Sequence, residues 1–204
     1  MGYAAIIAEK PSQARNFASA LGGMTGVFEG RQYQITNLRG HLYEFVDPSQ
    51  MVAPDLQRKY KMWDLTNLPW DPSVMNWKRE EQKGVSQLLS TVKTVLSRAD
   101  EIVIGTDLDS TGEGDLLAWE VIDELGFASG SKKFSRMEFT DEAVASVQKA
   151  FRSRRSIVSM EDEGMYRKAR YRSQFDLLSM QFTRIATNMG RASGQDLGLR
   201  QGRL

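Results

Sequence analysis

The chain has 204 residues, 41% of them hydrophobic, and a formal net charge of +1 at pH 7. This length allows one large domain, or one domain and part of another, and the near-neutral charge excludes an overall basic field that would attract nucleic acid. Cysteine is absent, which excludes disulfides and thiolate zinc sites, and no apolar run approaches the roughly 18 residues of a membrane span, so we expect a cytoplasmic protein with no membrane partner.

The N-terminal segment predicts a strand that ends in an acid. Residues 3–8 read Tyr-Ala-Ala-Ile-Ile-Ala, and Glu9 follows them directly. A helix is expected over 12–21, with Ser12 as its N-cap and a pair of glycines at 22–23 as its stop.

The next part of the chain mixes regular and irregular segments. Strands are expected at 24–28 and 32–36, joined as a hairpin. Residues 47–77 contain four of the five prolines and three of the four tryptophans without a clean period, which predicts an ordered but irregular insertion. Apolar residues at spacings of three and four then predict a helix over 79–98.

Strands and helices alternate from residue 101 onward. Strands are expected at 101–106 and 134–139, and helices at 113–125 and 141–152. This alternation predicts an α/β fold, in which a largely parallel sheet is covered by helices on both faces. In such folds ligands bind outside the carboxyl ends of the strands.

One long helix is predicted over roughly 160–188. Its apolar residues recur at helical spacing and are expected to form a packing stripe: Tyr171, Phe175, Leu178, Phe182 and Ile185. Beside the stripe, Arg172 lies four residues before Asp176. Read from the residues alone, this is an ion pair on a solvated face that contributes about 0.3–0.5 kcal/mol.

Two aspartates, Asp107 and Asp109, follow the strand at 101–106. Residues two apart on an extended chain share a face, so both carboxylates point into one crevice, where they repel by on the order of a few kcal/mol at an effective dielectric near 20. A divalent cation removes this repulsion. Mg²⁺ is typically held by one or two carboxylates while waters and phosphate oxygens complete its shell, so the turn predicts phosphate chemistry with Mg²⁺, or with Mn²⁺ in its place.

Three kinds of site contain such an aspartate pair. A calcium-binding EF-hand loop would need a glutamate where this chain has Ala118, and a helix before the loop. A phosphatase of the haloacid dehalogenase type would have the motif near the start of the chain and a second acidic pair after a later strand. A Toprim domain needs a glutamate at the end of an earlier strand, and Glu9 supplies it.

The Glu-Lys-Pro-Ser sequence at 9–12 resembles the opening of a type IA DNA topoisomerase and is most similar to the topoisomerase III branch. Further matches follow in the family's order. They are Gly40-His41-Leu42, the Tyr-Lys-x-Trp and Leu-Pro-x-x-Pro segments at 60–63 and 68–72, the acidic turn, a helix at 169–187 similar to the one that carries a DNA-contacting arginine, and Gly202-Arg203-Leu204.

The resemblance implies a domain organisation and a partner. Residues 1–152 would form a Rossmann-like Toprim domain with the insertion at about 47–77, and residues 153–204 would begin a helical DNA-binding domain. The implied reaction is cleavage and religation of single-stranded DNA without ATP, through a tyrosine that becomes linked to a 5′ phosphate.

The resemblance also implies residue roles. Glu9 would protonate the departing 3′ oxygen, with its pKa raised by neighbouring carboxylates, and Lys10 would stabilise the scissile phosphate. Asp107 and Asp109 would hold Mg²⁺. His41, Arg172 and Arg203 are expected to contact DNA, and for His41 a locally satisfied turn residue stays an equal alternative.

The sequence departs from the family pattern in two places. The family's turn is Asp-x-Asp-Arg-Glu-Gly-Glu, but here Thr111 replaces the first glutamate, and we expect Glu113 to compensate as a metal ligand. The family's tyrosine lies well beyond the motif at which this chain stops, at Leu204. We therefore expect an N-terminal piece of a prokaryotic, phage or mobile-element enzyme that is inactive without the missing C-terminal domains of the same polypeptide.

Two other functions stay open on the sequence. A stand-alone Toprim nuclease would use the same acids and a metal to activate water. A non-catalytic module would bind DNA with strong salt dependence and tolerate Asp107→Asn.

Overall fold

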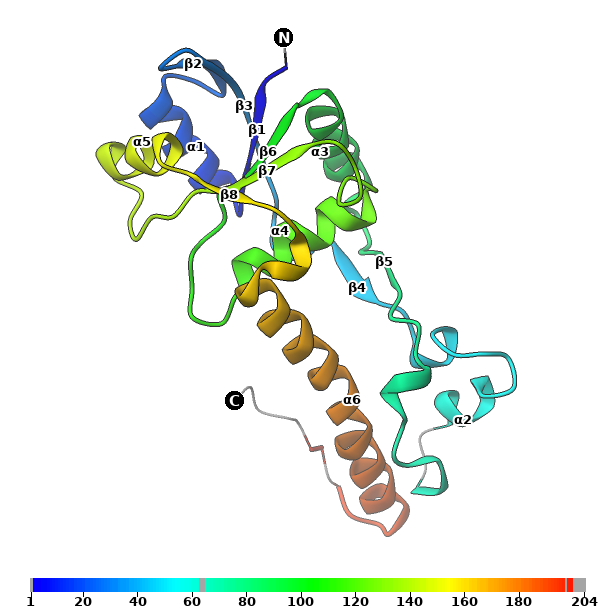
Figure 1. Cartoon of the computed structure of the whole chain (residues 1–204). Helices are drawn as coiled ribbons and strands as arrows, with labels where there is room; N and C mark the ends of the chain where they lie inside the picture. Colours follow the sequence, from blue (N-terminus) through cyan, green and yellow to red (C-terminus); the bar gives the residue numbers. More distant parts are fainter. Residues whose placement is uncertain (1, 63–64, 197, 200–204) are drawn as a thin grey trace. The chain divides into compact units, whose positions relative to one another are not determined.

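The computed structural model describes residues 2–62, 65–196 and 198–199 (Figure 1). The chain divides into two compact units. One unit contains the described residues up to Tyr43 together with Glu81–Arg170, and the other contains Glu44–Glu80 and the described residues from Tyr171 onward. This division differs from the predicted domain boundary at 152/153, which stays a prediction. In the described part of the chain, no helix is long and apolar enough to cross a membrane.

The first unit is built on a six-stranded sheet with the order β2-β3-β1-β6-β7-β8. The strands are β1 (Ala4–Ala8), β2 (Thr25–Phe28), β3 (Arg31–Asn37), β6 (Glu101–Ile104), β7 (Lys133–Arg136) and β8 (Arg155–Ile157). The four inner strands run parallel, and the edge strands β2 and β8 pair antiparallel with their neighbours. The predicted parallel core is therefore confirmed, while the three-residue edge strand β8 was not predicted, because it is too short to show a period.

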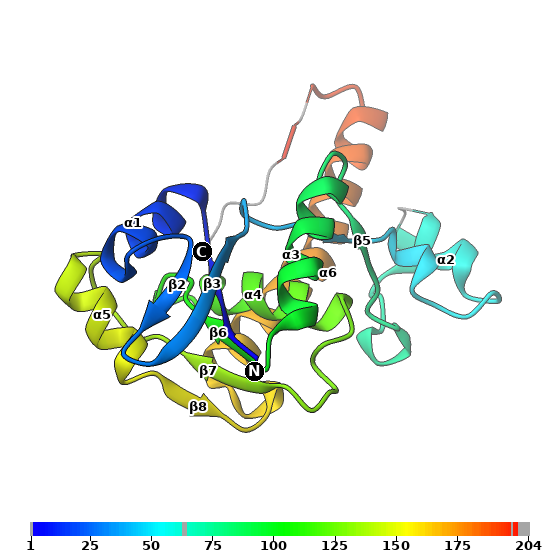
Figure 2. The ribbon, with the colours of Figure 1, turned by 90° about the horizontal axis from the view of Figure 1, so that it is seen from above.

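Helices cover both faces of this sheet, as Figure 2 shows. The covering helices are α1 (Pro11–Leu21) and α5 (Val144–Arg152) on one face, and α3 (Ser86–Arg98) and α4 (Glu113–Glu124) on the other. All residues of the central strand β1 are fully buried, since Ala5 and Ile7 contact one helical layer while Ala4, Ile6 and Ala8 contact the other. The predicted α/β class is confirmed.

Four predicted helix starts are wrong, and the helices expected from 141 and from about 160 begin at Val144 and Gly164. Helix α1 begins at Pro11 with Lys10 as its N-cap, because the fixed φ of proline suits the first helical position. The helix predicted from residue 79 begins only at Ser86. The segment Arg79–Glu81 is instead strand β5, which pairs with β4 (Tyr43–Phe45), and Gly84 turns the chain with a φ of +83°.

The second unit has a small core of its own, made by Val46, Met51, Val52, Tyr60, Trp70 and Met75. The rings of Tyr60 and Trp70 stack with centroids 5.5 Å apart. The backbone N–H of Trp70 donates to Gln181 Oε1 over 2.9 Å. Besides α2 (Gln57–Lys61), this part contains short 3-10 turns at Pro48–Gln50, Leu65–Asn67 and Pro72–Val74. The predicted insertion is thus irregular in its elements and ordered by its own core.

The long helix α6 spans Gly164–Ala192. Its predicted packing stripe is only partly correct. Ile185 is buried and Leu178 packs against the core of the second unit, but Tyr171, Phe175 and Phe182 are each more than half exposed. A helical period shows that one face is apolar and does not show how much of that face a neighbour covers.

Glu101, at the start of β6, is a buried carboxylate held by several donors. Arg154 Nε and Nη2 donate to it over 2.7 and 2.9 Å, and the Ser135 hydroxyl donates over 2.7 Å. Burial alone would raise the pKa of Glu101, but the bonds from Arg154 and Ser135 outweigh burial and lower it. Glu101 should therefore stabilise the fold in its ionised form.

We expect Glu101→Gln to lower the free energy of unfolding by about 1–3 kcal/mol at neutral pH, because it removes a charged acceptor. Because the pKa of Glu101 is lower in the folded state, its ionised form stabilises the fold at pH values above its unfolded-state pKa of about 4.3. This stabilisation is lost as the pH falls through the folded-state pKa. Urea denaturation at pH 7 and in acid should show the difference between the two proteins shrinking in acid. Asp123→Asn, at an exposed position, is the control. A difference that grows in acid would contradict this account.

Candidate functional site

Glu9, Lys10 and Asp107 meet at the carboxyl edge of the sheet. Glu9 follows β1, and Asp107 comes just after β6, which is its parallel neighbour. The backbone N–H of Asp107 donates to Glu9 Oε2 over 3.1 Å, and Lys10 Nζ lies 3.5 Å from Asp107 Oδ2. The ends of two adjacent parallel strands thus bring the side chains of Glu9 and Lys10 into contact with Asp107.

Asp109 caps the turn that leads into α4. Its Oδ1 accepts from the backbone N–H groups of Thr111 and Gly112 over 2.6 and 3.0 Å and from the Thr111 hydroxyl. Its Oδ2 accepts from the Gly114 N–H over 3.3 Å. Burial raises the pKa of Asp109, but the bonds from Thr111 and Gly114 outweigh burial and lower it. The threonine that replaces the family's glutamate therefore shapes the turn.

The two glycines of this turn allow close backbone contacts. A Cβ on Gly114 would lie 2.3 Å from the carbonyl oxygen of Asp107. Gly112 has a φ of +78°, and a Cβ there would lie 2.3 Å from the carbonyl oxygen of Met165, at the start of α6. The acidic turn can therefore pack this tightly only with glycine at both positions.

Sequence reasoning missed a buried arginine beneath the turn. Arg136 is 1% exposed, and its Nη1 and Nη2 donate to the carbonyl oxygens of Thr106 and Asp107 over 2.7 and 3.0 Å. Its Nε lies 3.2 Å from Oδ1 of the buried Asp115. Nothing in the sequence around Arg136 links it to Asp115, which lies 21 positions earlier in the chain.

A second missed residue is Gln13 on α1, which is fully buried. Its Oε1 accepts from the Glu9 N–H over 2.7 Å, and its Nε2 donates to Asp107 Oδ1 over 2.6 Å. The only available sequence signal was a polar residue on the apolar face of a short helix, which does not identify a partner 94 positions away.

His41 lies between two carboxylates. Its Nδ1 is 2.9 Å from Glu120 Oε2, and its Nε2 is 2.7 Å from Glu113 Oε1. The bond to Glu120 contributes most to a pKa of about 8, against the opposing effect of burial, and Glu113 adds to it. At neutral pH His41 is therefore an imidazolium that donates from both nitrogens.

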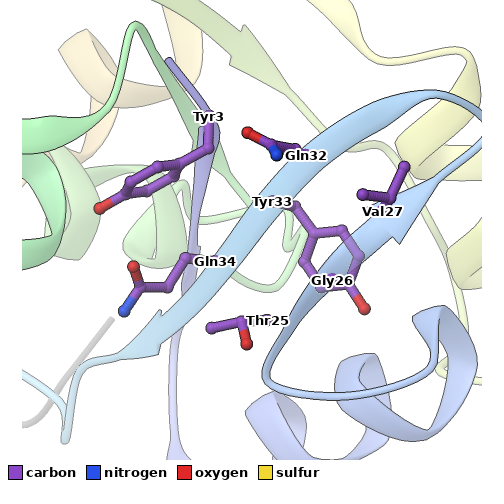
Figure 3. Close-up of a pocket in the computed structure, with 7 residues that line it drawn as sticks. All are labelled: Tyr3, Thr25, Gly26, Val27, Gln32, Tyr33 and Gln34. Atoms are coloured by element: carbon purple, nitrogen blue, oxygen red, sulfur yellow. The ribbon is translucent and has the colours of Figure 1, made fainter. Parts of the chain in front are cut away.

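A hollow of about 310 Å³ lies beside Tyr3 and the hairpin of β2 and β3 (Figure 3). It is lined by Tyr3, Thr25, Gly26, Val27, Gln32, Tyr33 and Gln34. None of these side chains is charged. Glu9, Asp107 and Asp109 lie at the other, carboxyl end of the parallel strands.

The family model for the Toprim domain matches residues 4–141. The chain belongs to the Toprim family. The matched residues include Glu9, Asp107 and Asp109. It confirms the family that was inferred from the glutamate and the aspartate pair.

Curated relatives of this Toprim chain are named DNA topoisomerase 3. The chain is 34% identical over 149 residues to the protein of Bacillus thuringiensis (strain Al Hakam), which covers 71% of this chain and 19% of the relative. It is 31% identical over 205 residues to the protein of Vibrio cholerae serotype O1, covering 98% of this chain and 30% of the relative. The inferred resemblance to topoisomerase III is confirmed, and the chain spans less than a third of these relatives.

The groups that the Toprim site could offer to Mg²⁺ are carboxylate oxygens. Burial raises the pKa of Glu9, and the carboxylates of Asp107 and Asp109 raise it further, although the N–H of Asp107 and the charge of Lys10 oppose them. Oδ2 of Asp107 lies 3.5 Å from Lys10 Nζ, and Oδ2 of Asp109 accepts from the Gly114 N–H over 3.3 Å. Hard oxygens of this kind fit Mg²⁺ held by one or two carboxylates and waters.

The remaining predicted site residues are Glu113, Arg172 and Arg203. Glu113 contacts His41, and within the described ranges no three histidine or acidic side chains form a group that could hold a metal ion. A metal-ligand role for Glu113 stays a prediction. Arg172 lies on α6 in the second unit, and Arg203 lies outside the described residues. The DNA contacts of both arginines also stay predictions.

We expect NMR titration to give His41 a pKa of about 8 and to give Glu120→Gln a lower value, because the strongest partner loses its charge. Because the pKa of His41 is higher in the folded state, its charged form stabilises the fold at pH values below its unfolded-state pKa of about 6.5. This stabilisation is lost as the pH rises through the folded-state pKa. Asp123→Asn should leave the titration unchanged. A wild-type pKa at or below 6.5 would show that His41 is not held between charged carboxylates.

Proposed function

We propose that this chain is the Toprim part of a type IA DNA topoisomerase and forms the acidic half of a centre that cleaves and religates single-stranded DNA without ATP. The observation that carries the proposal is the contact of Glu9, Lys10 and Asp107 at one strand edge, in a chain whose curated relatives are named DNA topoisomerase 3. The attacking tyrosine would come from residues of the same polypeptide outside this chain, acting in the cytoplasm of a prokaryotic host.

Glu9 is suited to move a proton at the leaving oxygen. Its raised pKa, caused first by burial, lets a larger fraction stay protonated near neutral pH than for an ordinary glutamate. It would donate this proton to the 3′ oxygen during cleavage and take it back during religation. Lys10 is half exposed and would place its charge against the scissile phosphate.

Asp107 and Asp109 would hold Mg²⁺, or Mn²⁺ in its place, through carboxylate oxygens at this strand edge. The bound ion would offset the charge of these acids and position the phosphates of the strand. Arg172 and Arg203 would contact the DNA backbone, and His41 would do so in exchange for one of its bonds to Glu113 and Glu120.

A chimera tests this function. This chain would replace the aligned segment of the Vibrio cholerae relative, 30% of that protein, and relaxation of a negatively supercoiled plasmid would be measured. We expect Mg²⁺-dependent, ATP-independent relaxation that is lost in Glu9→Gln and kept in Asp123→Asn, which changes an exposed acid on α4. Relaxation that survives Glu9→Gln would contradict the proposal.

The chain alone should neither relax nor nick the plasmid. Nicking by the chain in Mg²⁺ or Mn²⁺ would favour a stand-alone nuclease instead. DNA binding that is indifferent to both metal and Asp107→Asn, in a chimera that folds but does not relax DNA, would favour a non-catalytic module.

A further inference from the structure

Gln13 connects the two strand ends that carry the acids. It lies in the first half of α1 with its side chain wholly out of contact with solvent. Its amide oxygen accepts the N–H of Glu9 over 2.7 Å, and its amide nitrogen donates to Asp107 Oδ1 over 2.6 Å. One side chain therefore binds the residue after β1 and a carboxylate near the end of β6.

The same amide nitrogen also reaches a third acid. Gln13 Nε2 lies 3.4 Å from Glu142 Oε1, on the segment between β7 and α5, and Asn16 donates to the other oxygen of Glu142. Asp107 and Glu142 both line a hollow of about 370 Å³. The Gln13 amide thus separates two carboxylates that share this hollow.

We propose that Gln13 is a positioning residue that fixes the orientation of the Asp107 carboxylate, an inference that rests on the proposed metal role of Asp107. Gln13 donates a hydrogen bond to Oδ1 of Asp107, so the other oxygen, Oδ2, faces Lys10, whose Nζ lies 3.5 Å away. Oδ2 is then the oxygen that meets a divalent cation or its water. Gln13 acts through Asp107 and does not itself touch the ion.

The chemistry of the site explains why an amide serves here. The bridge needs an acceptor at one end for the Glu9 N–H and a donor at the other end for Asp107, and glutamine carries both. Methionine has a similar shape but lacks both groups. A glutamate would keep the acceptor while placing a third negative charge beside Asp107 and Glu142.

The test measures Mn²⁺ binding to the whole 204-residue chain, by the loss of the free-ion EPR signal. We expect Gln13→Met to weaken Mn²⁺ affinity on the order of 10-fold, the typical cost of losing a partner that orients a metal ligand. Gln148→Met is the matched control, because Gln148 bonds the carbonyl oxygen of Ala20 at the far end of α1. The control should leave Mn²⁺ affinity unchanged even if its melting temperature falls.

A double-mutant comparison separates positioning from general damage to the fold. If Gln13 acts through Asp107, Gln13→Met should cause no further loss of affinity in an Asp107→Asn background. A Gln13→Met chain that stays folded and binds Mn²⁺ as the wild type does would overturn the proposal. A loss that persists at full size in the Asp107→Asn background would overturn it as well.

A metal-free readout keeps this inference distinct from the proposed function. The side-chain amide protons of Gln13 should shift in the NMR spectrum and exchange faster when Asp107→Ala removes their acceptor. If those signals do not change, the positioning contact is wrong. If Asp107→Ala changes the Gln13 amide signals as expected but the wild-type chain does not bind Mn²⁺, the positioning contact is correct and the proposed metal role of the acids is wrong. Gln13 then has no part in metal binding.

Discussion

Arg136→Met is expected to lower the free energy of unfolding by about 3–5 kcal/mol, because it leaves a buried charge without its partner. Arg136 and Asp115 are only 1% and 3% exposed. The substitution also removes donors from the carbonyl oxygens of Thr106 and Asp107. These carbonyls belong to the segment that carries the acidic pair, so the turn should lose its shape together with stability.

Urea denaturation at neutral pH measures the effect. Arg136→Lys should recover only part of the loss, because one ammonium group cannot reproduce the fork of donors that a guanidinium offers. Arg152→Met is the surface control: Arg152 pairs with Glu29 where both side chains are half exposed, and a far smaller loss is expected there. If Arg136→Met were no more harmful than Arg152→Met, the acidic turn would not depend on the buried arginine.

Gly114→Ala is expected to have the second large effect. The added Cβ would lie 2.3 Å from the carbonyl oxygen of Asp107, and because that oxygen is a backbone atom, the chain itself must move. That movement also displaces the Gly114 N–H from Asp109 Oδ2. We expect a stability loss of roughly 2–4 kcal/mol, in the range of substitutions that overpack a tight site, and weaker divalent-cation binding.

Gly164→Ala is the matched control, since nothing lies within 4 Å of the position that its Cβ would take. It should be neutral or stabilising, because alanine favours a helix over glycine. Thermal unfolding and Mn²⁺ binding of both variants are the measurements. An unchanged melting temperature in Gly114→Ala would mean that the turn has more room than the structure gives it.

Much of the fold could be predicted because its signals are local. The apolar runs before Glu9 and Asp107, and the alternation of strand and helix patterns around them, are visible in short windows of sequence. Parallel neighbours end at the same edge of a sheet, so the meeting of the two acids followed from topology. The structure places Glu9 and Asp107 in direct contact, as that reasoning requires.

What could not be predicted depends on contacts between distant residues. The bonds from Gln13 to Asp107 and from Arg136 to Asp115 join positions with no shared period or motif. Thr111 looked like a missing ligand because the family pattern has a glutamate there. Its hydroxyl and N–H instead bind Asp109. The exposed aromatic residues of α6 show the same limit, since a periodic apolar face does not reveal its partner.

We propose that Glu9, Asp107 and Asp109 at this strand edge form a divalent-cation site. Mn²⁺ added to the isotopically labelled chain should broaden the amide signals of Glu9, Lys10, Asp107 and Asp109 before any others. The broadening should disappear in Asp107→Asn and persist in Asp123→Asn. Broadening that is unchanged in Asp107→Asn, or that centres on the uncharged hollow near Tyr3, would contradict the account.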